Sequence, residues 1–382
     1  MKWSRSMWGV VLAALCCVST SGCATRVRLK VLEPAAVYVP SDIRTLAVID
    51  RSRAGNAAQG IAAAVEGAFS GEALGVDAAG RVEAIHGLTG VLTESPRFRV
   101  VQVMSDSDLV DADLFGRELS WRAAKRVCAQ VRCQGIVALE AFDSDSTLME
   151  NRRTREEVTE DGRTVKKTVY EVSRSTRVTT GWRVYDTRRM TVLDQVYDVA
   201  ATDTWTEEGD TLEEARRKLP SQMETVQQIA YDMGEDYARR IAPSYVYVVR
   251  KLYTRGDPRF KQANNYVKAQ TWDPAVRLWE EVAREQDPKL RGKANFNLAL
   301  AAEVVGDLER ALNLAQAALE DLNNRRCVEY VRILQDRLAA QELLRQQMAH
   351  PPPRRGSLEY RRQSPQQSPE TTHQEPPSPR GR

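Results

Sequence analysis

The chain has 382 residues, of which 42% are hydrophobic and 28% charged, and its formal net charge is +3. This length is enough for two domains and a tail. A charge so close to neutral argues against nucleic acid as a partner. Only three histidines are present, at positions 86, 350 and 373, so we expect no metal and no other cofactor.

The amino terminus has the pattern of an export signal. Two basic residues precede the uncharged run 7–18. This run suits the core of a signal peptide and is shorter than the roughly 20 residues that a spanning helix needs. Ser21 and Gly22 precede Cys23 and resemble a bacterial lipobox, although Thr20 stands where leucine is usual. The resemblance implies cleavage before Cys23 and lipid on its sulfur; an ordinary secretory signal cleaved near Gly22 is the alternative.

The residue after the lipobox bears on location. It is Ala24 and not aspartate, which in the enteric lipoprotein sorting rule implies transfer to the outer membrane. Two or three acyl chains hold a protein stably, at about 0.8 kcal/mol for each buried methylene. No second apolar run of spanning length follows. We therefore expect a folded body tethered by lipid to the periplasmic side of the outer membrane.

The elements expected in the first half alternate between strands and helices. Val27, Leu29 and Val31 alternate with charged residues, which predicts a half-buried strand. The continuous apolar run 45–49 is typical of a central strand. Apolar periodicity then predicts helices over 56–94 with a break near 71–80. A strand over 97–103, a helix over 117–131 and a buried strand over 135–142 follow.

The next segment changes to long alternating strands. Between residues 163 and 205, charged side chains fill every second position, which predicts an antiparallel meander with one solvated face. The charged residues 152–161 indicate the exposed tip of a hairpin. Helices over 211–219 and 221–241, separated by Pro220, and a strand over 244–253 complete the unit. The expected fold class is α+β: a mixed sheet with helices and an antiparallel meander, followed by an all-α helical domain.

Two cysteines lie five positions apart at a helix-to-strand junction. In an oxidising periplasm Cys128 and Cys133 could form a small-loop disulfide. Two buried thiols are the equally weighted alternative.

The strand pattern resembles known periplasmic domains. The apolar strand 46–49, the strand 98–103 ahead of a helix, and the Asp186-Thr187 turn between two strands carry this resemblance. They are similar to the α/β domain of the curli-secretion lipoproteins and to the amino-terminal domain of TolB. The resemblance implies an oligomeric secretion or envelope-assembly component. The charge in 146–179 argues against a curli-type membrane barrel.

Residues 258–322 contain an internal repeat. Two sets of small and aromatic residues recur with a shift of 36 positions, close to the ~34 of a tetratricopeptide repeat. The segment resembles a divergent tetratricopeptide array, with a capping helix over 324–348. A small peptide groove is the functional interpretation, and a plain helical bundle is the alternative. The residues expected to pack the repeat or line the groove are Ala263, Tyr266, Trp272, Ala275, Trp279, Ala299, Gly306 and Ala311.

Taken together, these parts resemble a group of bacterial lipoproteins with an α/β domain near the lipid and tetratricopeptide helices near the carboxyl end. The expected divisions are a signal peptide (1–22), a lipidated tether with the first strand (23–43), a periplasmic α/β domain (44–254), tetratricopeptide-like helices with a capping helix (255–349) and a disordered Pro/Arg-rich tail (350–382). The tail holds eight of the 16 prolines and cannot bury enough apolar surface to order itself.

No catalytic site is expected. His86 is the only histidine inside the folded part and lies on an expected helix, and Asp143 and Asp145 lack the surrounding loop of a calcium site. We therefore expect a non-enzymatic, membrane-tethered binding or scaffold protein whose partners are other envelope proteins. The oligomeric assembly component is the alternative, and a hydrolase with an unrecognised site is the least favoured hypothesis.

Overall fold

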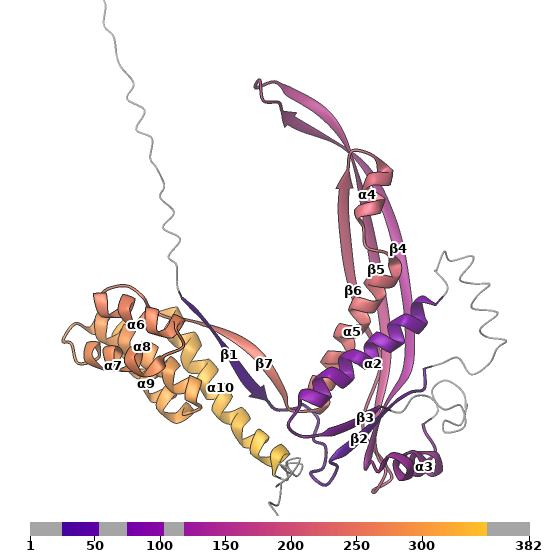
Figure 1. Ribbon diagram of the computed structural model, residues 1–382, viewed down its shortest axis with the longest axis horizontal. Coiled ribbons are helices and arrows are strands. Elements are labelled where there is room, and N and C mark those ends of the chain that lie inside the picture. The colour runs from indigo at the N-terminus through magenta and orange to yellow at the C-terminus, as the bar shows by residue number, and fades with distance from the viewer. Residues whose placement is uncertain (1–24, 53–74, 103–117, 350–382) are drawn as a thin grey trace, which may run out of the picture.

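A computed structural model describes residues 25–52, 75–102 and 118–349 (Figure 1). The expected α+β class is confirmed: a mixed five-stranded sheet carries helices and is followed by a carboxyl-terminal helical region. Cys23, the signal peptide and the proline-rich tail lie outside the described residues.

The central sheet has the strand order β3-β2-β4-β5-β6. β2 (Thr45–Asp50) runs parallel to β3 (Arg99–Gln102) and to β4 (Gly135–Val158). β5 (Thr164–Asp186) and β6 (Thr191–Gly209) continue the sheet in antiparallel register. The sheet is therefore parallel at one side and a meander at the other.

The apolar run of β2 is buried because helices cover both faces of the sheet. Leu46 and Val48 pack with α2 (Val76–Glu94) and α5 (Gln222–Ile241), whereas Ala47 and Ile49 pack with α3 (Trp121–Val131). Alternate side chains of a strand point to opposite faces, so a strand covered on both sides must be apolar throughout. The first part of the helices expected over 56–94 lies outside the described residues.

The last three strands of the central sheet, β4, β5 and β6, extend beyond α2 and α5 as an arm (Figure 1). β4 was expected to end at residue 142 but continues to Val158, and β5 runs without a break from Thr164 to Asp186. β6 pairs with β5 only as far as Tyr170, so residues 153–169 form a two-stranded hairpin at the tip. α4 (Leu212–Lys218) packs on the arm through Ala215.

The first and last strands form a separate two-stranded ribbon. β1 (Arg26–Glu33) pairs antiparallel with β7 (Ser244–Lys251), from Arg26 opposite Lys251 to Glu33 opposite Ser244. Val27, Leu29 and Val31 are buried, but they pack on the carboxyl-terminal helices and not on the central sheet. The chain therefore passes through the ribbon twice, before and after it builds the sheet.

The carboxyl-terminal region is a set of antiparallel helices: α6 (Pro258–Lys268), α7 (Trp272–Val282), α8 (Pro288–Val305), α9 (Leu308–Leu322) and α10 (Arg325–Met348). Asp257, Asp287, Asp307 and Asn324 accept hydrogen bonds from main-chain N–H groups at the helix starts, which satisfies donors that a helix leaves unpaired.

The apolar residues of α10 do not all face the core. Leu334 is fully buried, but Val328 and Leu343 are 44% and 50% exposed. Cys327 and Tyr330 fill the core in their place. The far end of α10 returns to the ribbon, where the Gln347 amide group donates to the Ala35 carbonyl and accepts from its N–H at 2.8 and 2.9 Å.

Candidate functional site

A groove with a volume of about 640 Å³ lies between the ribbon and α10. We call it the ribbon groove. The end of β1 and two residues of β7 form one wall of the groove, and one face of α10 forms the other. The turn between α8 and α9 closes one end of the groove. Its lining residues are Val31, Leu32, Glu33, Pro34, Val248, Arg250, Gly306, Leu308, Ile333, Asp336, Arg337, Ala340, Gln341 and Leu344. The volume falls within the range of about 300–1,000 Å³ that is usual for ligand pockets.

A buried carboxylate fixes two of the charged residues that line this groove. Glu303 of α8 has no exposed side-chain surface and accepts hydrogen bonds from Arg250 at 3.0 and 3.2 Å and from Arg337 at 2.5 Å. The Tyr330 hydroxyl donates to the same carboxylate at 2.8 Å. Burial, and then the Glu303 charge, raises the pKa of Tyr330, so its hydroxyl stays protonated. One glutamate thereby joins β7, α8 and α10.

The repeat residues singled out from the sequence lie inside the helical region. The core buries Ala263, Ala275, Ala299 and Ala311 completely and leaves Trp279 1% exposed. Tyr266 and Trp272 are partly buried against the same core, and the Trp272 and Trp279 rings meet edge to face. Gly306 adopts a left-handed backbone with φ of 84°, and it alone among the eight lines the ribbon groove. The other seven pack helices together.

The residues weighed for catalysis lie apart from the groove. His86 is half exposed on α2, with its Nδ1 atom 3.6 Å from Glu83. Asp143 lies near Asp77 and Asp145, and burial, then those charges, raises its pKa. Across residues 25–52, 75–102 and 118–349, no group of three histidine, cysteine or acidic side chains could hold a metal ion.

A second buried charge cluster lies where β2 ends, beside β4 and β5. The Glu140 carboxylate pairs with Arg51 at 2.7 Å and accepts a hydrogen bond from the Tyr185 hydroxyl at 2.5 Å. Burial and then Glu140 raise the pKa of Tyr185 to about 12. The Tyr185 oxygen also accepts the Leu119 N–H at 3.0 Å. The cluster holds β2, β4, β5 and the approach to α3 together, which is a structural role.

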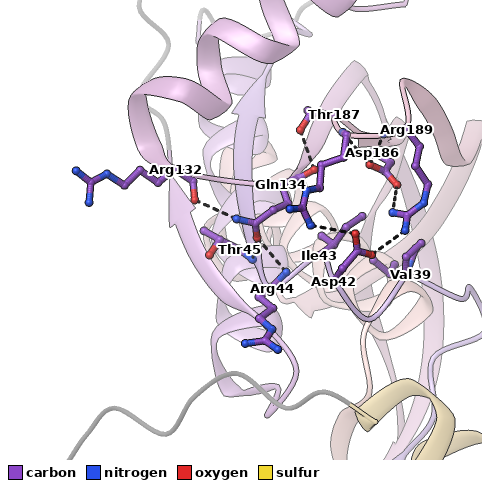
Figure 2. Close-up of polar contacts among 12 residues, drawn as sticks. Val39, Asp42, Ile43, Arg44, Thr45, Arg132, Gln134, Asp186, Thr187 and Arg189 are labelled. Atoms are coloured by element: carbon purple, nitrogen blue, oxygen red, sulfur yellow. Dashed lines mark hydrogen bonds and ion pairs between the residues drawn. The ribbon is translucent and has the colours of Figure 1, made fainter.

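The Asp-Thr turn that carried the resemblance to periplasmic domains locks the opposite end of the sheet. Figure 2 shows Asp186 and Asp42 holding Arg189 between them, at 2.8 and 3.0 Å. Thr187 donates to the Gln134 carbonyl at 2.8 Å, and the Gln134 side chain accepts the Thr45 N–H at 2.9 Å. These bonds close the turn onto the start of β2, so its polar groups are used to hold the sheet.

The described residues contain one disulfide and one free cysteine. Cys128 and Cys133 form a disulfide with a Cα–Cα distance of 4.5 Å, which ties the end of α3 to the segment before β4. Cys327 is a free thiol buried in the helical core. In the part of the chain that the structure describes, no helix has the length and apolar character needed to cross a membrane.

The fold and groove define a two-part α+β chain: a sheet domain, and a helical region that shares its core with the ribbon. Comparison with known families matches residues 43–253 to a domain of unknown function, DUF8603, and residues 261–336 to a second one, DUF6340. The chain belongs to the DUF8603 family, whose pattern spans more than half of it.

The other comparisons add little. No curated protein matches the chain. Among solved structures, a Helicobacter pylori protein described as a homologue of a neuraminyllactose-binding hemagglutinin aligns over 53% of this chain and 88% of its own. The identity is 9% and the TM-score 0.18, values too low to inform the fold or the function.

Proposed function

We propose that this chain is a lipid-tethered, non-catalytic binding protein of the bacterial cell envelope, which holds an apolar peptide segment of a partner protein in the ribbon groove. The observation that carries the proposal is the groove itself. Apolar side chains such as Val31, Leu308 and Leu344 line it, and Glu303 binds the guanidinium groups of both Arg250 and Arg337. Such a lining suits apolar side chains of a peptide better than a charged ligand.

The groove can be tested with a photo-crosslinking amino acid placed on α10. Leu344 lines the groove, whereas the neighbouring Leu343 is half exposed outside it. We expect a crosslinker at position 344 to capture a discrete envelope protein in intact cells, because the bound segment lies against that side chain. The matched control at position 343 should capture none. Equal capture at both positions, or none at position 344, would reject the groove as the binding site.

The lipid anchor is tested separately. The lipobox-like sequence before Cys23 supports it, and Cys23→Ala removes the sulfur that would accept the lipid. The variant is expected to keep its signal peptide or to leave the membrane fraction, because one acceptor atom carries the whole anchor. A mass spectrum of the mature amino terminus gives the readout. Cys17→Ala, inside the signal, is the matched control and should be processed normally. A Cys23→Ala protein that still sediments with the outer membrane would show anchoring by a partner.

The arm favours a second candidate function, assembly into an oligomer of the kind that the curli-secretion resemblance implies. The hairpin of residues 153–169 projects beyond β6, and within the described residues β6 has a strand partner on one side alone. An unpaired strand edge can pair with a neighbouring chain. Light scattering on the detergent-extracted protein should then give a multiple of the monomer mass. A monomer at all concentrations would rule this candidate out.

A further inference from the structure

The ribbon has a second face, opposite the one packed on the helices. In a strand, alternate residues point the same way, so residues 26, 28 and 30 of β1 and residues 245, 247, 249 and 251 of β7 share this face. The exposed Glu33 at the end of β1 points to the opposite side, where it lines the ribbon groove. We call it the outer ribbon face. Its polar and aromatic members are Arg26, Arg28, Lys30, Tyr245, Tyr247 and Lys251, all exposed, and Val249 lies among them. The face therefore combines four cations with two tyrosines and contains no acidic residue.

The cations on this face have no acidic partner among the residues that the structure describes. Within residues 25–52, 75–102 and 118–349, no ion pair includes Arg26, Arg28, Lys30 or Lys251. Instead, the Arg28 guanidinium lies 4.1 Å from the centre of the Tyr247 ring, and the Lys30 ammonium 4.3 Å from that of Tyr245. Stacking on a tyrosine orders a cation without cancelling its charge, so the face presents an ordered positive surface.

The sequence places this face next to the proposed anchor. Two residues, Ala24 and Thr25, separate Cys23 from Arg26 at the start of β1. Three extended residue steps span at most about 11 Å. That length is close to the Debye length of about 8 Å at physiological ionic strength. If Cys23 is lipidated, the first cations of the ribbon therefore stay within about one Debye length of the lipid headgroups, or only slightly farther away.

We propose that the outer ribbon face binds anionic phospholipid headgroups of the membrane in which Cys23 is anchored, and so sets the orientation of the whole protein. The inference rests on the lipid anchor of the proposed function. Cations near an anionic leaflet each strengthen binding, and tyrosines with exposed hydroxyls suit the membrane interface. The ribbon groove lies on the other side of β1 and β7 and would stay open to a partner.

The test uses the full lipidated protein in vesicles, with a fluorophore on a single introduced thiol. Val249→Cys places it on the outer ribbon face, and Val82→Cys on α2 is the matched control, because the two valines are 54% and 48% exposed. Cys128 and Cys133 are joined, and Cys327 is buried. Headgroup-labelled quencher lipids are mixed into phosphatidylcholine vesicles with and without phosphatidylglycerol.

We expect strong quenching at position 249 and weak quenching at position 82 on the anionic vesicles, and loss of this difference when salt is added. Arg28→Gln with Lys30→Gln should lower the ratio of docked to undocked ribbon roughly 25-fold, about fivefold for each cation. Arg122→Gln with Lys125→Gln removes the same charge from exposed positions of α3 and should leave the quenching unchanged.

The outcomes separate the two proposals. Vesicles that carry the protein but quench both positions equally overturn the membrane-binding face and leave the anchor standing. The membrane-binding face is likewise overturned if the two charge-removing variants behave alike. Protein that fails to float with vesicles, with a mass spectrum lacking lipid, overturns the anchor and with it this inference.

Discussion

Replacing Glu303 with glutamine is expected to lower the free energy of unfolding by about 3 kcal/mol. Removing one member of a buried ion pair costs about 3–5 kcal/mol, because the remaining charge stays buried without compensation. Here two guanidinium groups lose the same partner, but Arg250 and Arg337 are 13% and 22% exposed. Partial hydration of both arginines places the expected value at the lower end of that range.

The same substitution should weaken the ribbon groove. Arg250 and Arg337 line opposite walls, and Glu303 is the group that holds them together. Without its charge the two arginines repel each other, so the walls should separate. Crosslinking from position 344 should therefore fall together with stability, and urea denaturation followed by circular dichroism gives the stability readout.

A second glutamate provides the control for this experiment. Glu329 pairs with Arg325 on the surface of α10, where the side chains are 56% and 91% exposed. Exposed helix pairs contribute about 0.5 kcal/mol or less, so Glu329→Gln should unfold almost as the parent protein does. If Glu303→Gln costs no more than Glu329→Gln, the buried network does not hold the groove.

Glu303 also shows where inference from the sequence stops. It lies in the run Ala302-Glu303-Val304-Val305, where hydrophobicity alone would bury the valines and expose the glutamate. The structure does the opposite: measured over the whole residue, Glu303 is 3% exposed and Val305 is 78% exposed. The partners that make this possible lie on β7 and α10, and no local pattern reveals such distant contacts.

The strands were predicted where one face of the sheet is buried. β5 was predicted as part of the meander, because its buried residues Val178 and Val184 leave apolar positions in the sequence. β4 beyond residue 142 was not predicted, because the arm exposes both faces of most of this part of the strand. With both faces in water there is no apolar alternation to detect. The pairing of β1 with β7 was missed for a different reason, since the two strands are more than 200 residues apart.

Replacing Gly87 with alanine is expected to destabilise the sheet domain by about 2 kcal/mol. Gly87 of α2 lies against α5, and an added Cβ atom would come 2.1 Å from the Tyr231 carbonyl oxygen. That atom belongs to the main chain, so no side-chain rotation relieves the overlap and the helices must separate. Overpacking typically costs about 1–3 kcal/mol and occasionally more. The helix propensity of alanine returns at most about 1 kcal/mol.

The same helix offers the matched control. Gly90 is exposed on α2, and its added Cβ would meet nothing closer than the Tyr231 hydroxyl at 3.8 Å. Gly90→Ala should therefore stabilise the domain by up to about 1 kcal/mol through helix propensity alone. Denaturation midpoints should move in opposite directions for the two alanines. If Gly87→Ala instead raised the denaturation midpoint, as Gly90→Ala is expected to do, α2 and α5 would not be in close contact at Gly87.

α5 also contributes a glycine to its contact with α2. A Cβ atom at Gly234 of α5 would lie 1.9 Å from the Ala84 carbonyl oxygen of α2. Gly234→Ala should thus cost as much as Gly87→Ala, because both force the same two helices apart. Once one substitution has separated the two helices, the second added Cβ atom overlaps less with the facing main chain. The double variant should consequently lose less stability than the sum of the two single losses, the non-additivity expected of sites that share one backbone displacement.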